Sequence, residues 1–472
     1  MEKKQPHVVC FPCPAQGHIN PMMQFAKLLH SRGFFITFVY TDYTHRRQLE
    51  PLECLDGFQF EVISDGLPPD AGTMEILQTF RGSFRESCSV TFGELLRKLH
   101  NPSDGHVVTC IVSDAFMTFT RKVAEEVGIP DVIFCPMAAC GLMAFLNYPE
   151  LIRRGLAPLR DESYTSKGYL DTTIDWIPGM RDIRLRDLGS FLGSTDLDNF
   201  MLNFVANEAQ NALKAPMVIF NTFDSLEREV LHGFRSMFPA RIYSVGPLLL
   251  QRRLLSENVF KSVKLSMWKE EIECLKWLDS HEAASVIYVN FGSTTITTAQ
   301  QLLEFAWAIA DSNHPFLWVI RPDLVKGGQT ILPQEFMDRI EGRGMLVSWC
   351  PQEEVLAHPS ITVFLTHCGW NSTLESISFG VPMICWPFFG DQQTNCRYAC
   401  NEWGVGMEID SNAKREEIGV LIKEVVEGEK GKDMKKAALN WKESAEIGIK
   451  EGGSSHTNIE LLIQELLQLK GN

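Results

Sequence analysis

The stretch Ile361-Thr-Val-Phe-Leu-Thr-His-Cys-Gly-Trp-Asn-Ser-Thr-Leu-Glu375 indicates a buried strand, a tight turn and the start of a helix. Gly369 permits the turn, and Gly380 is expected to end the helix. Asn371 and Ser372 are good capping residues, so we expect them to cap it. A helix start presents unpaired backbone N–H groups and the positive end of the macrodipole. The pattern predicts an anion site suited to a diphosphate, although a plain helix cap would look the same.

Residues on both sides of this turn suit the rest of a nucleotide sugar. Trp349 closes an earlier strand, where its flat face could stack on a base or simply fill the core. Glu375 follows Asn371 by four residues, so it shares a helix face with Asn371 and could accept ribose hydroxyls. Asp391 and Gln392 follow the next strand and offer the acceptors and donors that a sugar ring needs.

Outward from this stretch, short apolar runs alternate with amphipathic helices over the whole chain. Such alternation predicts α/β structure with parallel sheets covered on both faces, in two doubly wound domains. Ligands should then bind at the carboxyl ends of the strands. The expected strands are His7–Pro12, Phe35–Tyr40, Val107–Val112, Val132–Cys135, Val286–Phe291, Phe316–Ile320, Met345–Trp349, Ile361–Leu365 and Met383–Trp386, and the main helices are Met22–Ser31, Phe116–Val127, Ala299–Asp311 and Asn458–Leu469.

The periodicity fails around residues 248–272, where Arg252, Arg253, Lys261 and Lys264 cluster. We therefore expect a first domain at 1–247, a linker at 248–272 and a second domain at 273–452. Glycines at 452 and 453 then precede a final helical segment, 453–472, which could belong to the second domain or pack back on the first.

Composition narrows the function. The net charge of −15 would repel polyanions, so neither nucleic acid nor an acidic membrane is expected as a partner. Thirteen irregularly spaced cysteines favour a reducing compartment, and no leader or membrane span is expected, so we predict a cytoplasmic protein. No G-x-G-x-x-G follows an expected strand, which disfavours a nucleotide-dependent oxidoreductase.

His18 and Asp114 form a candidate catalytic pair. His18 follows the first strand and Asp114 ends a later one, so both should lie at the same edge of the sheet. A neutral imidazole can accept a proton near neutral pH, and a carboxylate can orient it. A structural, hydrogen-bonding histidine is the alternative. The Asp196-Leu-Asp198 triplet lies in a polar stretch, so we expect a solvated loop there and no metal dependence.

The motifs resemble those of the plant UDP-dependent glycosyltransferases, family 1, which invert configuration and have the GT-B fold. The likeness covers the box from 349 to 392 and includes Gln-Gly-His-Ile-Asn-Pro at 16–21, Val-Gly-Pro-Leu at 245–248 and Asn-Phe-Gly-Ser at 290–293. It implies two facing Rossmann-like domains with a cleft between them and a C-terminal helix that packs back on the first domain. The N-terminal segment looks most like a subgroup acting on terpenoid, iridoid and phenolic alcohols.

The resemblance also implies roles for single residues. His18 and Asp114 would be catalytic. The residues implied for UDP are Ser293, Trp349, Cys350, Gln352, His367, Gly369, Asn371, Ser372 and Glu375, and those for the sugar are Trp370, Asp391 and Gln392. UDP-glucose would be the co-substrate, and the enzyme would be a monomer with no metal and no other cofactor.

We expect the acceptor, a small hydrophobic metabolite, in an apolar pocket that includes Phe116, Met137, Phe388 and Phe389. A terpenoid or iridoid alcohol is the first expectation and a flavonoid or phenol the second. Pro136 stands near where many family members carry a threonine or serine that reaches the sugar. Another UDP-sugar therefore remains open, as do a hydrolytic and a non-catalytic UDP-sugar-binding protein.

Overall fold

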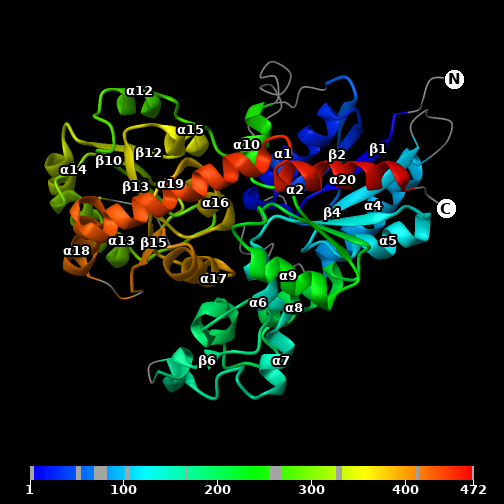
Figure 1. Ribbon diagram of the computed structural model, residues 1–472, viewed down its shortest axis with the longest axis horizontal. Coiled ribbons are helices and arrows are strands. Elements are labelled where there is room, and N and C mark those ends of the chain that lie inside the picture. The colour runs from blue at the N-terminus through cyan, green and yellow to red at the C-terminus, as the bar shows by residue number, and fades with distance from the viewer. Residues whose placement is uncertain are drawn as a thin grey trace. The chain divides into compact units, whose positions relative to one another are not determined.

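The computed structural model describes residues 5–48, 55–68, 82–100, 107–165, 168–254, 267–325, 332–410, 412 and 414–469. The chain forms two compact units. The first consists of Met1–Arg186, Phe191–Met267 and Ile447–Asn472, and the second of Asp187–Ser190 and Trp268–Glu446. Figure 1 shows helices packed around a sheet in each unit.

The first unit is built on a seven-stranded sheet whose neighbouring strands are parallel. In spatial order its strands are β3 (Phe58–Ile63), β2 (Phe35–Thr41), β1 (His7–Phe11), β4 (Val108–Asp114), β5 (Asp131–Cys135), β8 (Met217–Phe220) and β9 (Arg241–Ser244). Its helices are α1 (Gln16–Ser31), α2 (Asp42–Arg47), α4 (Ser83–Leu99), α5 (Thr120–Val127), α6 (Ala139–Leu146), α7 (Tyr148–Arg153), α8 (Phe200–Ala212), α9 (Arg228–Met237), α10 (Leu248–Leu254) and α20 (Ser454–Gln468). A small hairpin joins β6 (Thr173–Ile174) to β7 (Ile183–Arg184).

The second unit holds a six-stranded parallel sheet. In spatial order its strands are β12 (Gly344–Val347), β11 (Phe316–Val319), β10 (Val286–Asn290), β13 (Ile361–Thr366), β14 (Met383–Cys385) and β15 (Gly406–Glu408). Its helices are α12 (Glu273–Asp279), α13 (Ala299–Asp311), α14 (Gln334–Ile340), α15 (Gln352–Ala357), α16 (Trp370–Phe379), α17 (Gln392–Arg397), α18 (Arg415–Glu427) and most of α19 (Glu429–Ile449). A π-helical segment, Tyr398–Glu402, follows α17.

The expected fold class is confirmed by these two doubly wound sheets. Their central strands are apolar and buried along their whole length, because helices cover both faces. In the first sheet the strand order reverses between β1 and β4, and in the second between β10 and β13. Ligands of open α/β sheets bind outside the carboxyl ends of the strands at such switch points. The fold thus marks one candidate position in each unit.

The helix after β1 begins earlier than expected. We predicted Met22–Ser31, with Pro21 at its start, but α1 begins at Gln16 and contains Pro21. Proline lacks an N–H and so costs the helix one hydrogen bond. The buried face of α1, which includes Ile19, Met22 and Phe25, compensates by packing on the sheet. This extension places His18 in the first helical turn.

The expected linker at 248–272 is mostly wrong for the residues that the structure describes. Leu248, Leu249 and Leu250 are buried in α10 of the first unit, because the apolar run finds a place in that core. At the other end, Trp268 and the residues after it belong to the second unit. Lys261 and Lys264 lie outside the described residues.

The C-terminal helix α20 packs within the first unit. Ile459, Leu462 and Leu466 lie in the same hydrophobic core as the strands of the first sheet. Polar contacts fix its start, since Ser455 Oγ donates to Gly246 O (2.6 Å) and Asn458 Nδ2 donates to Ser244 O (3.0 Å). In Figure 1 this red helix lies beside the blue and cyan elements of the N-terminal half. No helix in the described part of the chain is both long and apolar enough to cross a membrane.

Candidate active site

His18 and Asp114 meet at the switch point of the first sheet. His18 lies in the first turn of α1 and Asp114 is the last residue of β4. The His18 Nδ1 atom is 2.9 Å from Asp114 Oδ2, with side-chain exposures of 20% and 0%. An ionised carboxylate can only accept a hydrogen bond, so Nδ1 carries the proton and the lone pair of the neutral ring is on Nε2. The two residues that the sequence paired are therefore in direct contact.

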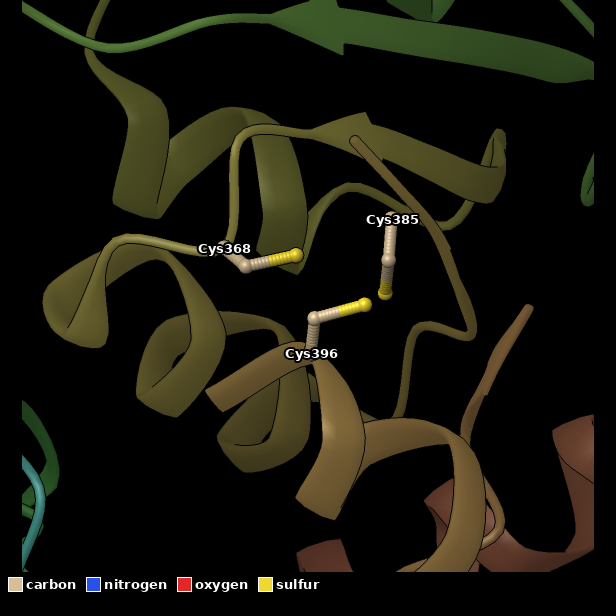
Figure 2. Close-up of side chains that lie close together, drawn as sticks. All are labelled: Cys368, Cys385 and Cys396. Carbon is tan, nitrogen blue, oxygen red and sulfur yellow. The ribbon is translucent and has the colours of Figure 1, made fainter. Parts of the chain in front are cut away.

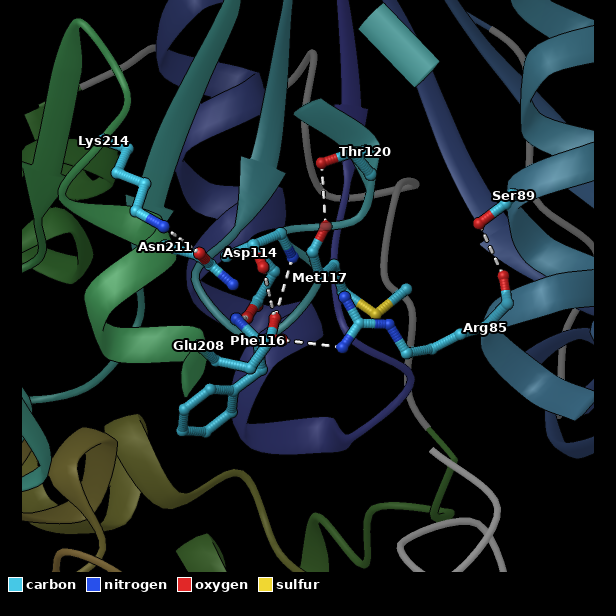
Figure 3. A network of polar contacts seen from close by, with 10 residues as sticks. Arg85, Ser89, Asp114, Phe116, Met117, Thr120, Glu208, Asn211 and Lys214 are labelled. Carbon is cyan, nitrogen blue, oxygen red and sulfur yellow. Dashed lines mark hydrogen bonds and ion pairs between the residues drawn. The ribbon is translucent and has the colours of Figure 1, made fainter. Parts of the chain in front are cut away.

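A short loop after β4 holds Asp114 in place. Asp114 Oδ1 accepts the N–H of Phe116 (2.9 Å), and Asp114 O accepts the N–H of Met117 (2.8 Å). This turn explains why α5 begins at Thr120 and not at Phe116 as predicted. Figure 3 shows Asp114 and Phe116 in this loop, beside Glu208.

A buried carboxylate anchors the far side of the same loop, and the sequence reading missed it. Glu208 on α8 accepts the N–H of Thr118 (3.0 Å) and the hydroxyl of Thr118 (2.7 Å). Its other oxygen accepts from Arg85 Nη1 (2.7 Å), so its charge is paired. Glu208 is only 1% exposed. Glu208 thus supports, through Thr118, the loop that follows Asp114, and Arg85 holds the Glu208 side chain in place (Figure 3).

Aromatic side chains gather next to His18. The Phe116 ring centroid lies 5.4 Å from that of His18, 6.4 Å from Phe145 and 6.1 Å from Phe204. Phe145 lies on α6 and Phe204 on α8. Met137, the other expected pocket residue of this unit, is buried before α6.

Helix α6 is held by another carboxylate that the sequence did not reveal. Glu227 accepts the backbone N–H groups of Ala139 (3.0 Å) and Cys140 (2.7 Å) at the start of α6. The side chain is 2% exposed, and burial raises its pKa. Two otherwise unpaired donors are thereby satisfied, which positions the helix that carries Phe145.

In the second unit the expected caps of α16 are wrong. The helix begins at Trp370, and its N-cap residue is Gly369, which has no side chain to accept a hydrogen bond. Asn371 and Ser372 are instead the second and third helical residues. The polar side chains therefore lie in the first turn, beside backbone N–H groups that the glycine leaves uncapped.

His367 packs between two glycines at the switch point of the second sheet. A Cβ atom on Gly292 or on Gly369 would collide with the His367 ring. Gly292 has φ 76°, a conformation that only glycine adopts readily. Burial, aided by the positive charge of Arg321, lowers the pKa of His367 to about 4, so the ring is neutral at pH 7. His367 Nδ1 is buried, and none of the described residues is its hydrogen-bond partner.

Arg321 holds the loop after β10, and no sequence pattern indicated this role. Its guanidinium is 2% exposed and donates to Ser293 O (2.7 Å), Thr295 O (2.6 Å) and Asp323 Oδ1 (2.9 Å). Ser293, which was expected to bind phosphate, is thus fixed through its backbone. The buried cation adds to the positive potential of the α16 start in this acidic protein.

Gln352, Ser372 and Glu375, all implied for UDP by the resemblance, contact one another. Gln352 Nε2 donates to Ser372 Oγ (2.9 Å) and to Glu375 Oε2 (2.7 Å). Its Oε1 accepts from Asn290 Nδ2 (2.7 Å) and from the hydroxyl of Tyr288 (3.0 Å). These hydrogen bonds connect the carboxyl end of β10 with the first turns of α15 and α16. Because they involve both the oxygen and the nitrogen of the Gln352 amide, they fix its orientation.

Trp349 stacks on a second tryptophan. Its ring centroid is 5.7 Å from that of Trp268, with an interplanar angle of 25°. Glu271 secures this segment, because its Oε1 accepts the N–H of Ser348 (2.7 Å) and its own N–H donates to Trp349 O (3.0 Å). Trp268 lay in the expected linker, so the sequence reading did not connect it with Trp349.

Two residues expected to contact the donor have buried side chains. The Trp370 indole is 4% exposed and packs against Trp403 at 6.0 Å between ring centroids. The Cys350 thiol is 4% exposed and lies 3.2 Å from the hydroxyl of Tyr288. Both side chains thus lie in the interior of the second unit.

The side chain of Gln392 binds the backbone of the segment just before it. Its Oε1 accepts the backbone N–H groups of Phe388 (2.8 Å) and Phe389 (3.1 Å). Asp391 Oδ2 accepts from Asn395 Nδ2 (3.1 Å). The Phe388 ring packs on Trp386 with centroids 4.3 Å apart, so it belongs largely to the core of this unit.

The expected solvated loop is present, since Asp196 and Asp198 are exposed. Within the described residues, the only group of three or more His, Cys, Asp or Glu close enough to share a metal ion consists of Cys368, Cys385 and Cys396.

Two doubly wound sheets, with a His–Asp pair at one switch point and an uncapped helix start at the other, define the GT-B class of glycosyltransferases. Solved structures of this class match the fold. The rice protein Os79 in complex with UDP (O. sativa) has a TM-score of 0.81 and 29% identity, covering 97% of this chain and 100% of that one.

Sequence comparison identifies the family. The profile described as UDP-glucoronosyl and UDP-glucosyl transferase matches residues 17–440, and the chain belongs to this family. It is 50% identical to the 7-deoxyloganetin glucosyltransferase of Catharanthus roseus over 472 residues, which cover 98% of this chain and 97% of that one. It is 49% identical to the (R)-mandelonitrile beta-glucosyltransferase of Prunus dulcis, covering 98% of both chains. The chain is thus an enzyme that uses a UDP-sugar donor.

Proposed function

We propose that this enzyme transfers glucose from UDP-glucose to a hydroxyl of a small hydrophobic metabolite, with inversion at the anomeric carbon. The observation that carries the proposal is the 2.9 Å contact between His18 Nδ1 and Asp114 Oδ2 beside an aromatic cluster. A base oriented by a carboxylate is what the attack of an alcohol requires.

His18 acts as the general base. Its Nε2 takes the proton of the acceptor hydroxyl as that oxygen attacks the anomeric carbon, and UDP leaves from the opposite face. Asp114 stabilises the imidazolium that forms, and its second oxygen stays bound to the N–H of Phe116. Glu208 keeps this loop in position through Thr118.

The second unit binds the donor. Trp349, supported by Trp268, stacks on uracil. Glu375 accepts hydrogen bonds from the ribose hydroxyls, and Gln352 holds the Glu375 carboxylate in place for them. The diphosphate lies at the start of α16, where Ser293, His367, Gly369, Asn371 and Ser372 surround the uncapped N–H groups.

The sugar contacts Asp391, the amide nitrogen of Gln392 and the main-chain N–H of Trp370. The helix dipole and the neighbouring donors stabilise the charge that develops on UDP, so the reaction needs no metal ion. Arg321 contributes to this potential from beneath the loop.

The acceptor is a terpenoid or iridoid alcohol in the first instance and a phenol in the second. Phe116, Phe145 and Phe204 provide an apolar wall next to His18. Two relatives are named for 7-deoxyloganetin and (R)-mandelonitrile, which supports a small alcohol. No disulfide joins the described cysteines, which supports the cytoplasm as the compartment, and we propose a monomer.

The test is UDP release by the purified protein with UDP-glucose, EDTA and a panel of iridoid, terpenoid and phenolic alcohols. We expect acceptor-dependent release that EDTA leaves unchanged. His18→Ala should lower kcat by about 10²–10⁴-fold. His30→Ala, in the last turn of the same helix, is the matched control and should retain activity.

Equal rates for His18→Ala and the unaltered enzyme would refute the base. Release that no acceptor stimulates would indicate a hydrolase. Because Pro136 departs from the usual residue, UDP-xylose and UDP-galactose are run in parallel, and a faster rate with either would overturn the assignment of glucose.

A further inference from the structure

Three thiols from separate elements converge inside the second unit. Cys368 lies in the turn after β13, Cys385 ends β14 and Cys396 lies on α17. Their sulfur atoms are within 4.8 Å of one another, and Figure 2 shows the three side chains pointing toward a common centre. The residues are 1%, 0% and 1% exposed. The Sγ atom of Cys400 lies 4.0 Å from that of Cys396.

The buried position restricts which ligand these thiols can hold. Thiolates prefer soft ions, but a divalent ion bound by three thiolates carries a net charge of −1. Placing such a charge in the interior of a protein is costly. Trivalent arsenic bound by three thiolates is neutral, so it avoids this cost.

We propose that Cys368, Cys385 and Cys396 form a binding site for trivalent arsenic, and that filling this site hinders donor binding. The entering species is neutral arsenous acid. At each thiol an As–S bond replaces an As–O bond, and the thiol proton leaves with the hydroxide as water. Three thiols and one arsenous acid thus give one tris-thiolate and three waters, with no change in oxidation state.

The effect on the donor follows from the position of Cys368, and it rests on the proposed function. This residue lies between His367 and Gly369 and has φ 64°. Its carbonyl accepts from Asn395 Nδ2 (3.0 Å), and its N–H donates to Thr366 Oγ1 (3.3 Å). An arsenic atom bonded to all three sulfurs ties the turn after β13 to β14 and α17, so filling the site alters the turn that carries the expected phosphate ligands His367 and Gly369.

The first experiment is native mass spectrometry of the full chain with arsenite, in buffer free of small thiols. We expect one adduct whose mass gain equals one arsenic atom less three hydrogen atoms. Cys396→Ala and Cys385→Ala should each lose this adduct. Cys88→Ala, which removes a buried thiol from the first unit, is the control and should keep it.

Three results would overturn the site. One is the absence of a three-thiol adduct. Another is the same adduct in Cys396→Ala and Cys385→Ala. The last is a gain of arsenic plus oxygen less one hydrogen, which indicates two thiols and would fit the neighbouring pair Cys274 and Cys350. Stoichiometric binding of Zn²⁺ that the same variants abolish would refute the charge argument.

The second experiment measures the KM for UDP-glucose with and without arsenite. We expect a rise of about tenfold in the unaltered enzyme and in Cys88→Ala, and none in Cys396→Ala. A small dithiol should reverse it. An adduct with an unchanged KM would refute the coupling to the donor. Failure of the glucosyltransferase assay itself would leave the mass measurement as the independent test of the site.

Discussion

The imidazole of His367 occupies the space that a Cβ atom on Gly292 would need. Both residues lie just after neighbouring strands at the switch point of the second sheet. His367 follows β13, and Gly292 comes shortly after β10. A glycine is required at 292 for two reasons, its positive φ of 76° and this close approach. The proposed diphosphate site therefore depends on a contact between two loops that are far apart in sequence.

Gly292→Ala, compared with a glycine that has only the positive φ, should distinguish the effect of backbone strain from the effect of the contact with His367. We expect the KM for UDP-glucose to rise by about tenfold or more, because the new methyl group displaces the His367 ring. Gly342→Ala is the matched control, since Gly342 also has a positive φ (78°), but apart from its two chain neighbours no described residue has an atom within 4 Å of its Cβ position. It should lose only about 1–2 kcal/mol of stability to backbone strain. Similar KM values for the two variants would contradict the role of the contact.

Asp114→Asn should reduce turnover without unfolding the enzyme. The amide keeps the size of the carboxylate and can still accept the N–H of Phe116, but it loses the charge that stabilises the imidazolium. We expect kcat to fall by about 10²–10⁴-fold in steady-state assays. Asp196→Asn, in an exposed loop, should behave as the unaltered enzyme. A folded Asp114→Asn variant with normal kcat would show that the carboxylate does not assist the base.

Trp268→Ala should weaken donor binding through Trp349. Stacked aromatic pairs contribute about 0.5–1.5 kcal/mol beyond the area they bury, so we expect the KM for UDP-glucose to rise by a few-fold to about tenfold. Trp176→Ala removes a tryptophan that packs on Arg154 in the first unit and provides the control. If UDP bound equally to the Trp268→Ala variant in calorimetry, Trp349 would not need this support.

His367 should make stability depend on pH. Its folded pKa of about 4 lies below the ordinary value of 6.5, so the unfolded chain binds more protons between these values. The stabilisation is complete above about pH 6.5 and is lost as the pH falls toward 4, by on the order of 3 kcal/mol.

The measurement is the free energy of unfolding in urea at several pH values across this window. His367→Gln should flatten the dependence, whereas His232→Gln, which removes an exposed histidine, should not. A slope that is the same in His367→Gln and in the unaltered chain would mean that other groups cause the pH dependence.

Much of the fold could be predicted because its signals are local. The apolar runs of β1, β10 and β13 are continuous, and Gly380 ends α16 in the left-handed conformation as expected. Boundaries were less accurate where a local rule competed with packing. We placed the start of α1 too late because Pro21 was expected to begin the helix, and the capping preference of Asn371 pointed two residues past the true N-cap, Gly369.

The sequence by itself determined the two doubly wound sheets, the His18 and Asp114 pair and the polar turn at 367–372. The sheets and the turn depend on residues that are close together in the chain. The pair depends on strand ends that a parallel sheet brings to the same edge. Only the tertiary structure decided that Arg321 holds the loop after β10, that Trp268 stacks on Trp349 and that Glu208 holds Thr118. It also brought three thiols together. Such contacts depend on how distant segments pack, and packing leaves no periodic pattern in the sequence.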